Sequence, residues 1–277
     1  MNVYLALSKG FGLESGRSDS PNLLNIIQSS QDTGSAKTRF YQDVIRQSKE
    51  KWASPLYQKG YKLRYDQMKE ALVGSLSSNR IITLEMENVS PMVVGHGGVS
   101  VLETSLMLHR TYGVPYIPGS TLKGLTAQYC RRLLGVDNPL FQEGQPYYTA
   151  LFGSTSNAGY IEFHDAWITP DSLASSLLLD VLTPHHQKYN SIRPDNKQNY
   201  ADFAPRDDDD PVPIPFLAVR GQFRIMLTCP DHALPEDHAE QWLSIAQEIL
   251  MHALEKEGVG GKTNAGYGIM RLKKGEG

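Results

Sequence analysis

The spacing of hydrophobic residues changes from helical to strand-like at about residue 80. Between Ala36 and Leu76, apolar side chains recur every three to four positions with basic residues between them, which predicts two or three amphipathic helices. Met1 to Ser8 alternates weakly instead, and Asn22 to Gln28 resembles a short helix, but residues 1–36 otherwise carry little periodicity. We therefore expect residues 1–79 to form a helical region packed on the remainder of the chain.

After residue 80 the pattern predicts strands and helices in turn. Strands are expected over residues 80–94, 100–109, 160–168, 215–229 and 268–273, helices over about 120–134 and 235–256, and either a short strand or a helix end over 177–182. This order approximates β-α-β-β-α-β, the arrangement of ferredoxin-like folds and of RNA-recognition modules. We therefore predict an α+β, ferredoxin-like (RRM-like) domain over residues 80–277, with long loop insertions at about 135–159 and 185–215.

The charge of the chain argues against a free-standing nucleic-acid binder, which would usually be basic. The formal net charge is −3 and the isoelectric point is near 6.2. The average conceals a gradient, because Lys37 to Arg80 carries six more basic than acidic residues, whereas Asp207 to Asp210 is an unbroken acidic run. Opposed patches suit an assembly with a polyanion on one side and protein neighbours on another, although either patch alone is equally typical of a solvated face.

Cysteine content and hydropathy narrow the class of protein further. Cys130 and Cys229 lie far apart and outside any C-x-x-C spacing, which indicates buried thiols and neither a disulfide framework nor a zinc site. No apolar run approaches the roughly 20 residues of a membrane span, and the first residues lack the pattern of a cleavable leader. We expect a cytoplasmic protein with no membrane, metal or cofactor partner.

The stretch with the strongest chemical signal is the glycine-rich sequence from Gly258 to Gly268. Five glycines in eleven residues permit positive φ angles and close approach to a ligand, and successive N–H groups can hold phosphate oxygens. Gly261-Lys262-Thr263 resembles part of a nucleotide-binding P-loop, but Lys256 occupies the position of its first glycine and the order is helix, loop, strand. ATP or GTP binding is thereby excluded, and the alternative to a phosphate site is a flexible turn. The candidate ligand-binding residues here are Gly260, Gly261, Lys262, Thr263 and Asn264.

A second anion-facing site is predicted at the start of the helix near residue 120. Ser120 or Thr121 is placed to cap this helix, whose N-terminus offers free N–H groups, and Lys123 lies in its first turn. Simple helix capping is the alternative. His96, between glycines after the first strand, could act as a general base, but with no carboxylate near it in sequence it is more typical of a turn residue that touches backbone or phosphate.

His185 and His186, with Asp180 nearby, are the best candidates for catalysis. A histidine and a carboxylate could act as acid and base in RNA cleavage through the 2′-OH, or could bind a metal. Adjacent residues of an extended chain point to opposite sides, however, so the two imidazoles cannot easily share one task. A binding or structural loop is the favoured interpretation.

Four segments in this order resemble the RAMP superfamily, and within it the subunits of Cmr, the type III-B CRISPR effector. They are Val101 to His109, Gly113 to Gly124, Leu182 to His185 and the glycine-rich loop, and the resemblance spans residues 80–274. It implies a ferredoxin-like, non-catalytic subunit near the tail of a ribonucleoprotein, holding the 3′ part of the CRISPR RNA. The implied partners are that RNA, the repeated Cmr backbone subunit, the other tail and small subunits and, indirectly, target RNA. The implied phosphate contacts are Lys123 and the glycine-rich loop.

Two alternatives belong to other functional classes. A CRISPR-RNA processing endoribonuclease would use His185 or His186 beside the glycine-rich loop, since related RAMP proteins cut RNA with histidine-containing sites. A scaffold that binds only protein would tolerate the loss of Lys123 and Lys262 without loss of RNA affinity.

Overall fold

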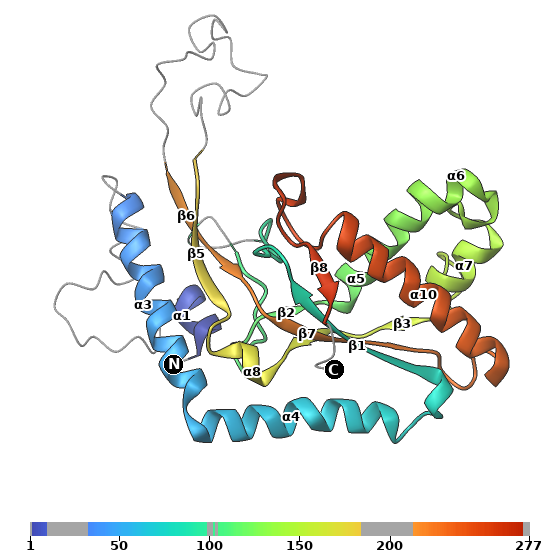
Figure 1. The fold of residues 1–277 in the computed structure, drawn as a ribbon, viewed down its shortest axis with the longest axis horizontal. Helices are drawn as coiled ribbons and strands as arrows, with labels where there is room; N and C mark the ends of the chain where they lie inside the picture. The colour runs from blue at the N-terminus through green and yellow to red at the C-terminus, as the bar shows by residue number, and fades with distance from the viewer. Residues whose placement is uncertain (1, 10–32, 99–101, 103–104, 184–212, 274–277) are drawn as a thin grey trace, which may run out of the picture.

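The computed structural model describes residues 2–9, 33–98, 102, 105–183 and 213–273 (Figure 1). Its centre is a mixed arrangement of helices and an antiparallel sheet, which confirms the α+β class. The strand order is β2-β4-β7-β1-β8, with β3 paired to β7 beside β4. The strands are β1 (Ile81–Asn88), β2 (Tyr116–Ile117), β3 (Glu162–Phe163), β4 (Ala166–Ile168), β7 (Gln222–Thr228) and β8 (Met270–Leu272).

Two helices cover one face of this sheet. Alternate residues of the central strands are buried toward them, as in the pairs Leu84 with Ile225 and Met86 with Phe223. Helix α10 (Glu236–Lys256) packs against α5 (Gly119–Tyr129) and against β1, β7 and β8. The helix predicted over residues 235–256 is confirmed, and its apolar side chains form the buried face of α10.

The segment after α5 is helical and ordered, where the sequence suggested a loop insertion. A π-helical turn, η2 (Cys130–Leu134), leads into α6 (Gly135–Asp137), η3 (Pro139–Phe141) and α7 (Pro146–Phe152). The ring of Tyr147 lies 5.3 Å from that of Phe141 and 5.7 Å from that of Trp242 on α10. These aromatic side chains anchor the segment to the body of the protein.

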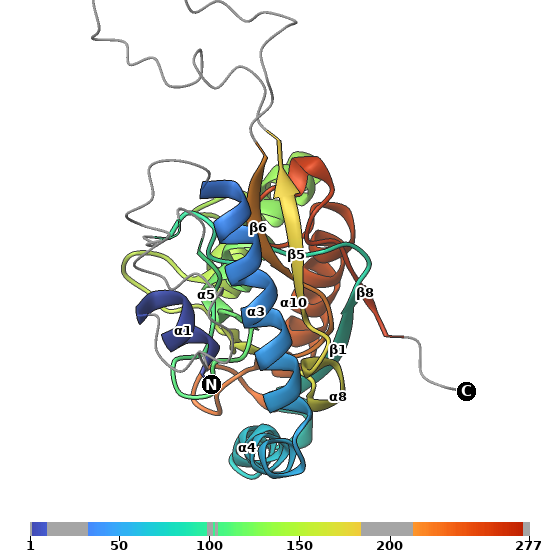
Figure 2. The ribbon, with the colours of Figure 1, turned by 90° about the vertical axis from the view of Figure 1, so that its left-hand side faces the viewer.

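Helix α4 (Pro55–Val73) lies across the opposite face of the sheet (Figures 1 and 2). The Tyr61 hydroxyl donates to the carbonyl of Ile168 at 2.7 Å, and its ring stacks on Trp167. The guanidinium carbon of Arg224, on β7, lies 3.6 Å from the ring centroid of Tyr65. Two tyrosines one turn apart thus fix α4 on the sheet.

Helix α3 (Thr33–Ala53) packs against a separate two-stranded ladder, β5 (Leu177–Leu182) and β6 (Ile214–Val219), as Figure 2 shows. Residues 177–182 are therefore a strand, one of the two expected possibilities. The predicted insertion from 185 lies almost wholly outside the described residues, and only its last residues, in β6, are described.

The N-terminus, whose weak alternation predicted no particular element, is helix α1 (Val3–Lys9), which buries Val3 and Ala6. Two predicted strands are shorter than expected among the described residues. The strand expected over 80–94 ends at Asn88, and Met92 then bridges Val219. Of the strand expected over 100–109, the described residues make only an isolated bridge between Leu108 and Pro115. None of the described helices is long and apolar enough to cross a bilayer.

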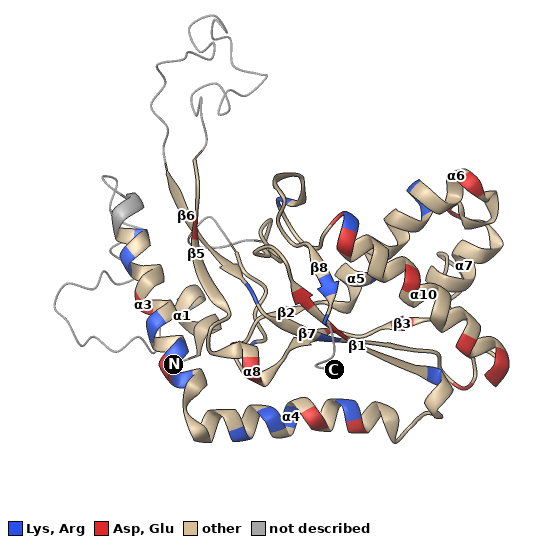
Figure 3. Ribbon diagram, viewed as in Figure 1, with Lys and Arg blue, Asp and Glu red and all other residues tan. Residues whose placement is uncertain are grey.

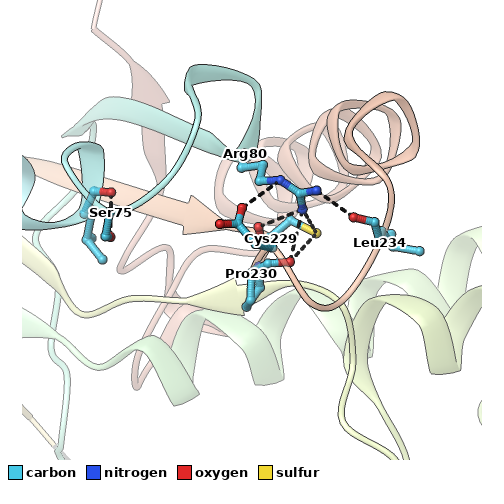
Figure 4. A network of polar contacts seen from close by, with 7 residues as sticks. Ser75, Arg80, Cys229, Pro230 and Leu234 are labelled. Atoms are coloured by element: carbon cyan, nitrogen blue, oxygen red, sulfur yellow. Dashed lines mark hydrogen bonds and ion pairs between the residues drawn. The ribbon is translucent and has the colours of Figure 1, made fainter.

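Arg80 anchors the loop that leads into α10 (Figure 4). It is 6% exposed. Its guanidinium donates to the carbonyls of Pro230 at 3.1 Å and Leu234 at 2.7 Å, and pairs with Asp231 at 3.0 Å. A single buried cation thus holds the loop between Pro230 and Leu234 by two carbonyls and one carboxylate.

We expect Arg80→Met to lower the free energy of unfolding by about 3 kcal/mol, because two partly buried carbonyls lose their charged donor. The matched control is Arg131→Met, since Arg131 forms a solvent-exposed pair with Glu143 at 3.5 Å. That substitution should cost less than about 1 kcal/mol. Urea unfolding of the two variants measures the difference. Equal losses would show that the Arg80 contacts do not stabilise the loop.

Candidate nucleic-acid interface

The glycine-rich loop folds back on itself and on the segment that follows β1. The N–H of Val259 donates to Gly268 at 2.9 Å, that of Gly261 to Val93 at 2.7 Å, and that of Gly268 to Pro91 at 2.8 Å. These groups are therefore not free to hold phosphate, contrary to the expectation of an open cradle. Within the described part of the chain, the N–H groups of Gly260 and Lys262 have no hydrogen-bond partner.

Two of the glycines are required by packing. Gly260 has φ 99°, and a Cβ there would lie well inside 3.0 Å of the Val93 carbonyl oxygen. Gly268 has φ 78°, and a Cβ there would overlap the carbonyl of Val259. Part of the glycine density thus serves the shape of the loop.

The loop forms one wall of a groove of about 880 Å³. The other walls are residues 94–98, part of residues 105–107 and the first turns of α5. The groove brings together most of the side chains and glycines that the sequence indicated at separate places: His96, Ser120, Thr121, Gly260, Gly261, Thr263 and Asn264. Residues some 140 positions apart in the chain thus share one surface.

The cations at the groove differ from those expected. Lys123 is half-buried and does not line it, and Lys262 lies within the loop with its Nζ 5.4 Å from the ring centroid of Phe216. The lining cations are Arg132 and Lys256, which the sequence patterns did not single out. Arg132 pairs with Glu257, whereas Lys256 is exposed and has no ion-pair partner among the described residues.

The start of α5 is not capped as predicted. The N-cap is Pro118, and neither Ser120 nor Thr121 makes a capping hydrogen bond. Instead the carboxylate of Asp165 accepts from the Gly119 N–H at 2.8 Å. Position 119 requires glycine, because a Cβ there would overlap the Phe163 carbonyl. The start of the helix therefore lies directly against the turn between β3 and β4. Ser120 and Thr121 are left to line the groove.

Other basic residues gather away from this groove. Figure 3 shows lysines and arginines along α4, where Lys59, Lys62, Arg64 and Lys69 are exposed. This is part of the basic segment seen in the sequence, and it is a second surface that could attract a polyanion.

His96 is the histidine of the groove. Its ring lies 6.0 Å from that of Phe216, and its Nδ1 is buried with no hydrogen-bond partner among the described residues. Burial, and then the positive charge of Lys262, lower the pKa of His96. The imidazole is therefore neutral at pH 7. His185 and His186 lie outside the described residues. Among the residues that are described, no group of three His, Cys, Asp or Glu side chains could hold a metal.

We expect the fold to lose stability as the pH falls below about 6.5, the ordinary histidine value. Burial is the largest cause of the lowered pKa values of His96, His109 and His164, so the unfolded chain binds more protons near this pH. Melting temperatures between pH 7.5 and 5.5 measure the effect. His164→Gln removes one titrating ring and should flatten the profile. A melting temperature that is constant or rises toward pH 5.5 would contradict the prediction.

Comparison with known proteins identifies the family. The family model described as the RAMP superfamily matches residues 85–271, more than half of the chain. The chain belongs to the RAMP superfamily. Two curated relatives are similar. The CRISPR system Cmr subunit Cmr6 of Pyrococcus furiosus is 28% identical, covering 77% of this chain and 74% of the relative. The CRISPR system CMR subunit Cmr6 of Saccharolobus solfataricus is 24% identical, covering 76% of this chain and 63% of the relative.

Among solved structures, this RAMP protein is similar to a chain in the cryo-EM structure of the type III-B Cmr-beta complex bound to cognate target RNA. The TM-score is 0.54 at 20% identity, covering 78% of this chain and 65% of the other, so the likeness concerns the fold. The resemblance seen in the sequence, to the RAMP superfamily and within it to Cmr subunits, is confirmed, and both curated relatives are subunit six of Cmr.

Proposed function

We propose that this RAMP protein is a non-catalytic subunit of a type III-B (Cmr) ribonucleoprotein that binds CRISPR RNA and caps the 3′ (tail) end of the backbone. Its partners would be the repeated backbone subunit, the other tail and small subunits and, indirectly, target RNA. The names of its curated relatives support the assembly. The observation that carries the RNA-binding role is the groove, which joins a cationic rim to exposed backbone of the glycine-rich loop.

We further propose that residues 80–277 form a ferredoxin-like unit on which residues 1–79 pack. The support is the order β8-β1-β7-β4 with antiparallel neighbours, together with helices α5 and α10 on one face. In this arrangement α5 and α10 lie side by side on one face, so the start of α5 and the loop after α10 both line the groove. The groove would thus be a consequence of the topology.

The chemistry of the groove favours binding over cleavage. Cleavage through the 2′-OH needs a base and an acid near the scissile phosphate. Among the described lining residues, the one histidine is His96, and the one carboxylate, Glu257, is paired with Arg132. Such a lining can neutralise phosphates but offers no obvious pair for proton transfer.

The test is the binding and integrity of labelled single-stranded RNA with the purified chain. The double variant Arg132→Ala/Lys256→Ala, which removes both lining cations, should bind about tenfold more weakly, and the slope of log affinity against log salt should fall by roughly 1.4, or 0.7 for each phosphate that is no longer neutralised. Lys123→Ala is the matched control and should change neither. RNA that is cut, with cutting abolished in His185→Ala, would establish the endoribonuclease alternative. Unchanged affinity in the double variant would favour a protein scaffold.

A further inference from the structure

We propose that a second hollow, adjoining the groove, binds one unpaired nucleobase of the RNA strand whose phosphates lie in the groove. The inference rests on the proposed function. The hollow has a volume of about 490 Å³, and it shares Ser105 and Met107 with the groove. Pockets of this size commonly hold small organic groups. Because the two spaces share an edge, one strand can place a phosphate in the first and its base in the second.

The walls of the hollow are surfaces on which a base can stack. Tyr4 of α1, His109 and Tyr116 of β2 all line it. The Arg110 guanidinium also lines it, 6.0 Å from the ring centroid of Tyr4, and the rings of His109 and Tyr116 lie 6.2 Å apart. Unstacked RNA bases are recognised on such tyrosine, histidine and arginine planes.

The helix that carries Tyr4 is positioned before any ligand binds. The Asn2 side chain accepts from the Leu5 N–H at 3.3 Å at the start of α1, and donates to the carbonyls of Arg110 at 2.9 Å and Thr111 at 3.0 Å. Gly113 leaves no room for a Cβ beside Asn2. The helix that carries Tyr4 is therefore held against the turn that carries Arg110, which lowers the entropic cost of binding.

One residue distinguishes this hollow from a phosphate site. Asp165 lines it with an exposed carboxylate, of which Oδ1 already accepts from the Gly119 N–H. The negatively charged carboxylate repels phosphate, but its oxygens can accept a hydrogen bond from the amino group of adenine, cytosine or guanine. His109 adds no charge, because its Nδ1 accepts from two backbone N–H groups and burial lowers its pKa. The geometry therefore suits a base that carries an exocyclic amino group.

The test compares binding of ten-nucleotide oligo-A, oligo-C and oligo-U RNA by fluorescence anisotropy. The wild-type chain should bind oligo-C and oligo-A about three- to fivefold more tightly than oligo-U. This is the change in affinity expected from one hydrogen bond, between the amino group of the base and Asp165, which uracil cannot form. Asp165→Asn keeps an acceptor for Gly119 but presents an amide donor, so it should abolish or reverse this ratio. Tyr4→Leu should weaken all three about tenfold. The control is Tyr147→Leu on α7, which lines neither the groove nor the hollow and should leave affinity unchanged.

The outcomes separate this inference from the proposed function. If Arg132→Ala/Lys256→Ala weakens binding but neither Asp165→Asn nor Tyr4→Leu alters affinity or base preference, the base site is overturned and the RNA-binding groove stands. If the wild-type chain binds none of the oligonucleotides, both are overturned. Circular dichroism of the variants confirms that they are folded, and the ratio in Asp165→Asn is independent of any general decrease in affinity.

Discussion

Gly268→Ala is expected to lower the free energy of unfolding by about 4 kcal/mol, because the new Cβ would meet backbone atoms that cannot easily move. It would overlap the carbonyl of Val259, whose own N–H donates to the Gly268 carbonyl, and φ at Gly268 is 78°. Both a steric overlap with backbone and a left-handed conformation oppose the alanine. The loop would have to move away from the end of α10, so RNA affinity should fall as well.

Gly266→Ala separates the two contributions. Gly266 has φ 85°, but a Cβ there would have nothing within 4 Å. It should therefore show only the cost of the left-handed conformation, about 1 kcal/mol. Urea unfolding of both variants, with RNA binding measured on the folded fraction, gives the comparison. Equal effects at the two positions would mean that the loop accommodates a Cβ at Gly268 and does not pack tightly against Val259.

The sequence indicated both walls of the groove, but it could not join them. Glycine density marked residues 258–268, and the Gly-Ser-Thr sequence before an apolar helix marked the start of α5. Their proximity depends on the hydrogen bond from Gly261 to Val93 and on the packing of α10 against α5. Such contacts between distant residues leave no periodic signal. The RAMP resemblance supplied the connection that local patterns lacked.

Local rules failed where a distant residue replaced a near one. Ser120 and Thr121 satisfy the usual preference for a helix cap, yet Asp165, more than forty residues further along the chain, accepts from the first N–H of α5. Lys123 was predicted to contact phosphate because of its place in the first turn, but Arg132 and Lys256 line the groove. A signal for Lys256 was present, since it ends the amphipathic pattern of α10 immediately before the glycine-rich loop.

The basic surface of α4 is the principal rival to the groove as an RNA-binding site. Two exposed helical glycines, Gly124 on α5 and Gly60 on α4, provide a matched comparison, because a Cβ at either would have nothing within 4 Å. Gly124 lines the groove, whereas Gly60 lies among the lysines of α4. Glutamate at either position should keep or slightly raise stability, since glutamate favours a helix more than glycine does. Each variant thus adds one negative charge to one candidate surface.

Gly124→Glu is expected to weaken single-stranded RNA binding about tenfold, the effect of roughly 1.4 kcal/mol of repulsion between the new carboxylate and a nearby phosphate. Gly60→Glu should change affinity by less than about twofold, because α4 lies on the opposite face of the sheet from α5 and because salt screens a charge at that distance from the groove. The measurement that most directly tests the RNA-binding groove is therefore the ratio of RNA affinities of these two variants at one salt concentration. We predict that Gly60→Glu binds RNA about ten times more tightly than Gly124→Glu. Equal affinities, or tighter binding by Gly124→Glu, would contradict the assignment of the groove.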